Sequence, residues 1–91
     1  MPASYSENRV DLTINVKDGE STNVEGAKVN FNGQIKLTGS NGNAVFKANK
    51  NSTGLYRVTA EDMKRDVIGS IEVQDSAKTE NIVINLKKKS V

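Results

Sequence analysis

Acidic side chains gathered in one polar stretch are the first candidates for chemistry in this sequence. Asp18, Glu20 and Glu25 lie within a few residues of one another. Such a group suggests Ca²⁺, because this hard cation prefers several oxygen ligands. Their spacing follows no calcium-loop pattern, so a solvated loop is the favoured interpretation, and we predict no metal site.

A second charged stretch, residues 61–66, mixes acidic residues with Lys64 and Arg65. A pair of carboxylates there would be suited to acid–base chemistry, with Glu61, Asp62 and Asp66 as the available groups. The chain has no histidine and no cysteine, so it lacks the usual acid–base group near neutral pH and the thiolate nucleophile. A charged surface loop is therefore the favoured interpretation. We predict that the protein is not an enzyme, with no catalytic residue and no cofactor.

Aromatic rings are the second kind of candidate, because sugars and unpaired bases stack on exposed rings. The chain has two tyrosines and two phenylalanines. Phe31, Phe46 and Tyr56 fall at positions predicted to face a core, and only Tyr5 lies outside the predicted strands. The aromatic residues therefore favour a core over a binding platform.

The remaining sequence signals are weak. Residues 51–53 (Asn-Ser-Thr) fit the N-glycosylation pattern, which a chain this rich in asparagine and serine matches by chance. Residues 87–89 are all lysine and are typical of a solvated chain end. The net charge is only +2, and no apolar run approaches the ~20 residues of a membrane span. We expect no nucleic-acid partner and no membrane insertion.

Strict alternation of apolar and polar residues predicts the elements that hold these side chains. Alternation places one apolar face on each strand, and glycine–asparagine turns such as Asn32-Gly33 and Asn41-Gly42 separate the segments. The predicted strands cover residues 10–16, 27–31, 35–37, 43–48, 55–60, 67–73 and 81–86, with residues 49–53 as an exposed loop. The predicted inward side chains are Val10, Leu12, Ile14, Val16, Ala27, Val29, Phe31, Ile35, Leu37, Ala44, Phe46, Tyr56, Val58, Val67, Gly69, Ile71, Val73, Ile82, Ile84 and Leu86.

Seven short strands of this kind predict an all-β, antiparallel β-sandwich, because sheets with one apolar face must cover each other. The chain has 91 residues, which is enough for one domain only. We assign residues 1–9 to a polar leader, 10–87 to the sandwich and 88–91 to a solvated tail. If the domain acts outside a cell, we expect its export signal to lie on a larger protein or to have been removed.

The order of these signals resembles the carboxypeptidase regulatory-like family. The matching segments are Val24-Glu25-Gly26-Ala27-Lys28-Val29-Asn30-Phe31, Ser40-Asn41-Gly42-Asn43-Ala44-Val45-Phe46 and Gly54-Leu55-Tyr56-Arg57-Val58-Thr59-Ala60, after Val16-Lys17-Asp18-Gly19. The resemblance covers about residues 10–86 and implies a transthyretin-like (prealbumin-like), Ig-like Greek-key sandwich. It implies a non-catalytic module, usually one of several in exported or cell-surface proteins. The family's acidic turn is replaced here by Ser40-Asn41-Gly42.

The sequence is also distantly similar to Cna-B type domains of surface proteins, which form an internal Lys–Asn isopeptide bond beside a buried acid. Aligning that pattern places Ile14 at the reactive lysine and Ala60 at the acid, so both groups are missing. Lys17 and Glu61 are close in sequence, but alternation puts each on the opposite side of its strand. We expect no isopeptide bond.

We therefore expect a structural or adhesive module, a spacer or display domain of an exported cell-surface protein or of a virion surface such as that of a phage. Its expected partners are proteins or neighbouring modules of a larger assembly. The alternative is an accessory module that binds a glycan or a protein through loops at the end of the sandwich. The loops to consider are residues 20–23, 49–53 and 62–66.

Overall fold

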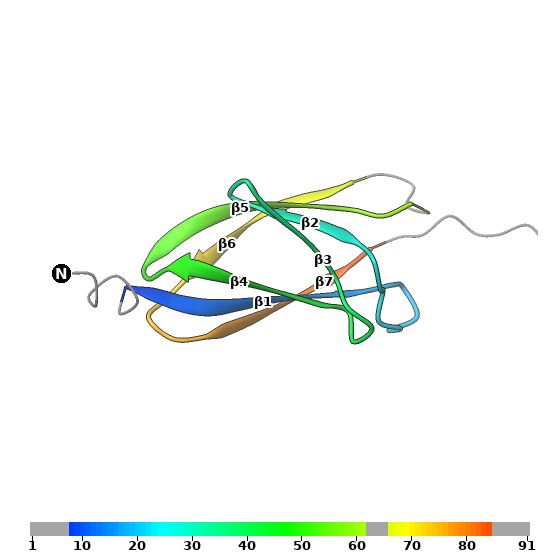
Figure 1. Ribbon diagram of the computed structural model, residues 1–91, viewed down its shortest axis with the longest axis horizontal. Helices are drawn as coiled ribbons and strands as arrows, with labels where there is room; N and C mark the ends of the chain where they lie inside the picture. Colours follow the sequence, from blue (N-terminus) through cyan, green and yellow to red (C-terminus); the bar gives the residue numbers. More distant parts are fainter. Residues whose placement is uncertain (1–7, 62–65, 85–91) are drawn as a thin grey trace, which may run out of the picture.

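A computed structural model describes residues 8–61 and 66–84, and these form seven strands in two packed sheets (Figure 1). The all-β prediction is confirmed. The strands are β1 (Arg9–Lys17), β2 (Lys28–Phe31), β3 (Gln34–Leu37), β4 (Asn43–Asn49), β5 (Ser52–Thr59), β6 (Val67–Val73) and β7 (Lys78–Val83). Tyr5, Leu86, the three lysines at 87–89 and most of the predicted loop 62–66 lie outside the described residues.

One sheet has three strands in the order β4-β1-β7, and the other has four in the order β3-β2-β5-β6. The prediction of a wholly antiparallel sandwich is wrong, because β1 and β7 pair in parallel. The chain crosses from one sheet to the other between β6 and β7, so that β7 starts at the end of the sandwich where β1 also starts (Figure 1). The two neighbouring strands therefore run in the same direction.

The core lies between the sheets and follows the predicted alternation. The strand β1 contributes Leu12, Ile14 and Val16, none of which is exposed. Phe31 of β2 and Phe46 of β4 meet across the core with their ring centroids 5.7 Å apart. The other buried apolar side chains are those of Ala27, Val29, Ala44, Ala48, Val58, Ile71, Val73, Ile82 and Ile84, with Val10, Val24, Tyr56, Ala60 and Val67 partly buried against them.

The hairpin of β2 and β3 corrects one part of the predicted core. Asn32 and Gly33 have φ of 50° and 89°, which suits the predicted two-residue turn. Such a turn pairs Phe31 with Gln34, and residues directly opposite each other share a face of the sheet. Because Phe31 points into the core, Gln34 faces the same side. Ile35, the next residue along β3, must therefore point outward. Ile35 and Leu37, predicted to face inward, are 56% and 64% exposed.

The predicted loop at residues 49–53 is also wrong, since it shrinks to Lys50 and Asn51. The strand β4 continues to Asn49 and β5 begins at Ser52. Asn51 adopts a positive φ of 55°, which lets the chain turn within two residues. The amides of Lys50 and Asn51 donate to the carbonyl oxygens of Asn8 and Gln74, so the turn is held at both sides.

The last strand begins earlier than predicted. β7 spans Lys78–Val83 because its polar first residues pair with β1, beginning with Lys78 opposite Leu12. Ile82 and Ile84 are buried as expected. Backbone pairing thus extends a strand into residues whose composition suggests a loop.

Candidate functional site

Of the three acidic residues considered for calcium, Asp18 stabilises a turn of the backbone. One carboxylate oxygen of Asp18 accepts hydrogen bonds from the amides of Glu20 (2.9 Å) and Thr22 (3.0 Å). Glu20 and Glu25 are exposed. Within residues 8–61 and 66–84, no three acidic side chains come together in a way that would hold a metal ion. Asp18 therefore acts as the cap of the β1–β2 turn.

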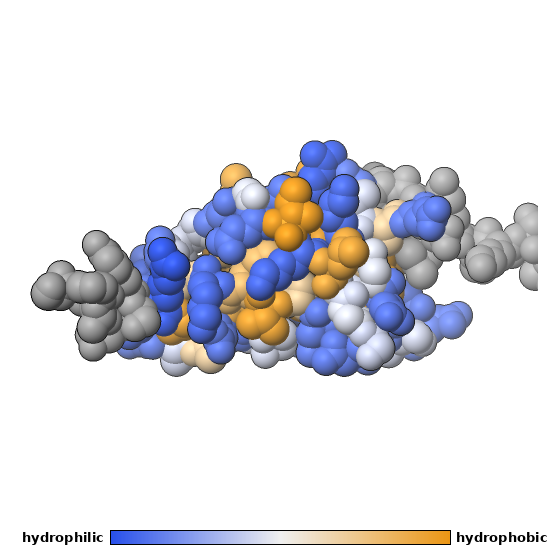
Figure 2. Space-filling view, in the orientation of Figure 1, coloured by the Kyte–Doolittle hydropathy of each residue, from blue (hydrophilic) through white to orange (hydrophobic). Residues whose placement is uncertain are grey.

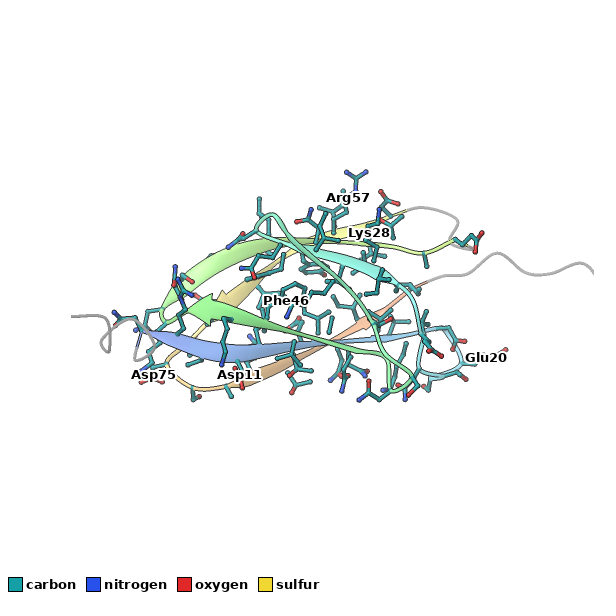
Figure 3. All side chains as sticks on the ribbon, in the orientation of Figure 1. Asp11, Glu20, Lys28, Phe46, Arg57 and Asp75 are labelled. Atoms are coloured by element: carbon teal, nitrogen blue, oxygen red, sulfur yellow. The ribbon has the colours of Figure 1, made fainter. Side chains whose placement is uncertain are left out.

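The second acidic stretch is described only at its ends. Asp66 accepts hydrogen bonds from Arg57, with its Oδ2 at 2.7 Å from Nε and 2.6 Å from the terminal guanidinium nitrogen. Arg57 stands on the outer side of the four-stranded sheet (Figure 3). Glu61 is exposed, and residues 62–65 lie outside the described part. The pair joins β5 to the start of β6.

The three described aromatic rings belong to the core. Phe31 and Phe46 are 2% and 1% exposed, and Tyr56 packs against the buried cluster. Figure 3 shows Phe46 between the two sheets. Tyr56 lies close to Gly69, where a Cβ atom would approach the tyrosine oxygen to 2.6 Å. These rings therefore offer no stacking platform.

The two positions aligned with an isopeptide bond carry no reactive group. Ile14 is fully buried in the core, and Ala60 is partly buried against it. Lys17 lies on the opposite side of β1, where its Nζ donates to Asn15 Oδ1 at 2.7 Å and to Asn23 Oδ1 at 3.0 Å. The lysine thus contacts amide oxygens in a partly exposed network, and no acidic side chain is buried among residues 8–61 and 66–84.

We expect the intact mass of the protein to equal the mass of its sequence. An isopeptide between Lys17 and an asparagine would release one ammonia, and the loss would appear directly in the mass spectrum. The Lys17→Arg variant is the control, because its guanidinium preserves the charge and does not form this bond. A deficit of one ammonia that disappears in the variant would contradict the expectation.

An apolar surface at one edge of the sandwich was missed by the sequence analysis. It consists of Ile35 and Leu37 of β3 and Val45 of β4, which are 56%, 64% and 44% exposed. Figure 2 shows apolar side chains gathered over the region where β3 and β4 lie in Figure 1. We call these three side chains, together with Lys36, the β3 edge surface.

Lys36 lies within this surface and bridges the two sheets. Because it alternates with Ile35 and Leu37, its side chain is directed toward the inner side of β3. Its Nζ donates to the carbonyl oxygen of Val45 at 2.7 Å and lies 5.6 Å from the centre of the Phe46 ring. Lys36 therefore covers the gap between β3 and β4 and shields the edge of the core.

The other edge of the sandwich has a matching lysine. Lys78 of β7 donates from Nζ to the carbonyl oxygen of Glu72 of β6 at 2.9 Å. At both edges, a lysine from one sheet thus bonds a backbone carbonyl of the other. A charged residue of this kind on an edge strand opposes uncontrolled pairing between molecules.

The backbone of β3 is free on the side away from β2. The Thr38 amide donates to the Ala27 carbonyl. Hydrogen-bonded pairs alternate along an antiparallel hairpin, so the β3 residues bonded to β2 are Thr38, Lys36 and Gln34. The amide and carbonyl groups of Ile35 and Leu37 consequently point outward. No described residue forms a hydrogen bond with these outward groups.

Two of the three loops proposed for binding are described, and these two do not form one surface. The loop at residues 20–23 and the turn at Lys50 and Asn51 lie at opposite ends of the sandwich (Figure 1). A shallow polar depression beside that turn is lined by residues 51–53 and 72–74. Loop residues of this composition suit solvent contact, and those at one end are separated from those at the other by the length of β1.

Comparison with known proteins leaves the chain without an assigned family. No protein-family model matches it, and no curated protein is similar to it. Within the described residues there is no helix of the length and hydropathy needed to cross a membrane. The structure itself establishes an all-β domain with sheets of three and four strands.

Proposed function

We propose that this domain is a non-catalytic structural module, a spacer or display domain of an exported cell-surface or virion surface protein. It contacts a neighbouring part of that assembly through the β3 edge surface. The observation that carries the proposal is the cluster of Ile35, Leu37 and Val45, three large apolar side chains exposed beside one open sheet edge. Apolar side chains gathered in this way are typical of interaction sites.

The energy available at this surface suits a neighbour within an assembly. Burying one such side chain completely contributes about 1.5–3 kcal/mol, and these three are already about half buried. The association of two free molecules offsets most of what such a contact supplies, so binding between free partners is weak. A neighbour in the same assembly has a high effective concentration, so a small contact is enough to fix its position.

The resemblance to the carboxypeptidase regulatory-like, transthyretin-like family supports the proposal through residues that shape the chain. Gly26 and Gly42, which belong to the matching segments, have φ of 82° and 80°. A Cβ atom on Gly42 would meet the Val16 carbonyl oxygen at 2.8 Å. The similarity therefore concerns turns and packing, as expected of a scaffold whose role is to hold its neighbours in place.

The test is a screen of the isolated domain against a glycan array, with small sugars and nucleotides added in a thermal-shift assay. A structural module is expected to bind none of them tightly and to show no change in melting temperature. A glycan that binds tightly, with binding lost when the loop at residues 20–23 or the turn at Lys50 and Asn51 is replaced, would overturn the proposal. It would establish the accessory binding module.

A further inference from the structure

We propose that the free edge of β3 binds an extended segment of a neighbouring protein as an added β-strand. The segment carries an acidic residue between two apolar residues. This inference rests on the proposed function and names the chemistry of the contact. The edge pairs through the backbone, the apolar side chains of β3 contact those of the segment, and Lys36 binds the acid.

The backbone provides the first part of the argument. Ile35 and Leu37 direct their amide and carbonyl groups away from β2, and no described residue satisfies them. Two residues spaced in this way present the donor and acceptor pattern that a further strand pairs with. The edge of β4 is partly used already, because Val45 accepts from Lys36 and Asn43 accepts from the amide of Gly39. The edge of β3 is thus the more available of the two.

The side chains determine which segment fits. In a paired strand, residues opposite each other share a face. The residues opposite Ile35 and Leu37 would therefore lie on the outer side of the sheet, beside two side chains that are more than half exposed. Apolar residues at these two positions would cover the exposed side chains, so the segment is apolar at alternate positions.

Charge determines the residue between them. The residue opposite Lys36 would lie on the inner side of the edge, close to the Lys36 ammonium group. That ammonium group has three N–H donors and uses one on the Val45 carbonyl. A carboxylate is the side chain that complements the two remaining donors. The segment is therefore acidic at its central position.

The same lysine disfavours a second copy of this domain as the occupant. In a symmetric antiparallel pair of β3 strands, Ile35 would lie opposite Leu37 of the copy. That register places Lys36 directly opposite the Lys36 of the copy, and like charges in this position are destabilising. Lys36 thus disfavours the copy in this register and favours an acidic segment.

The experiment titrates the isotopically labelled protein with a synthetic peptide that contains Thr-Val-Glu-Val-Thr, and follows the amide NMR signals. We expect saturable shifts centred on Ile35 and Leu37. A peptide with lysine in place of glutamate should bind about five-fold more weakly, because an exposed pair is replaced by a repulsion. The Lys36→Glu variant should reverse this preference, which a merely structural role of Lys36 would not do.

The matched controls are Leu37→Thr on the edge and Leu55→Thr on the outer face of β5, since the two leucines are 64% and 66% exposed. Only Leu37→Thr should weaken binding. Shifts at the end loops, equal binding of both peptides, self-association of the free protein through β3, or no binding at millimolar peptide would each overturn the inference. If the glycan screen also finds no ligand, such a result would reject the strand-pairing contact but would not reject the proposal of a structural module.

Discussion

The Ile14→Ala variant is expected to lose about 2–5 kcal/mol of unfolding free energy, because the substitution removes buried apolar atoms and leaves a cavity. Ile14 is fully buried in the middle of β1, the central strand of its sheet. It lies opposite Ala44 of β4, whose small side chain has little volume with which to fill the gap. Urea denaturation followed by circular dichroism measures the loss.

Thr13→Ala is the matched control, one residue earlier on the same strand. Thr13 faces the other side of the sheet, where it lies opposite Val45 of β4 and Thr79 of β7 and is partly exposed. Its substitution should cost less than half as much as that of Ile14. If the two variants ranked in the opposite order, the assignment of the faces of β1 would be wrong.

Gly54→Ala is expected to destabilise the domain by about 1–3 kcal/mol, through overpacking of the core. Gly54 lies on β5, and a Cβ atom at this position would overlap the ring of Phe31. That ring is 2% exposed and packs against Phe46, so it has little freedom to move aside. The melting temperature, measured by differential scanning calorimetry, should fall accordingly.

Gly19→Ala separates this effect from the general effect of replacing a glycine. Gly19 is exposed in the β1–β2 turn, and a Cβ atom there would meet no atom within 4 Å. We expect its melting temperature to stay close to that of the unchanged protein. Equal losses at Gly54 and Gly19 would show that the close packing of Phe31 against β5 does not matter for stability.

The core could be predicted from sequence because alternation is a local signal. Leu12, Ile14 and Val16 face one way whatever their strand pairs with, and the structure buries all three. The Asn32-Gly33 turn was also predictable, since both residues adopt the positive φ that it requires. The same turn also determines that Ile35 points outward. A two-residue loop fixes the register, and the register conflicts with reading every apolar residue of β3 as core.

Features that depend on distant parts of the chain could not be predicted in this way. The parallel pairing of β1 with β7 follows from where the chain crosses between sheets, which no local pattern specifies. The contact of Lys36 with the carbonyl of Val45 joins the edges of two different sheets. In sequence, Lys36 reads as one more polar residue of an alternating strand. The β3 edge surface therefore depends on the packing of β3 beside β4, which belong to different sheets.

Amide hydrogen exchange of the protein in its native assembly, compared with the isolated domain, measures whether the β3 edge surface contacts a neighbouring protein. We expect the assembly to protect the amides of Ile35 and Leu37 on the β3 edge, while exchange in the loop at residues 20–23 and in the turn at Lys50 and Asn51 stays the same. Protection confined to that loop or turn, with the β3 edge unchanged, would contradict it.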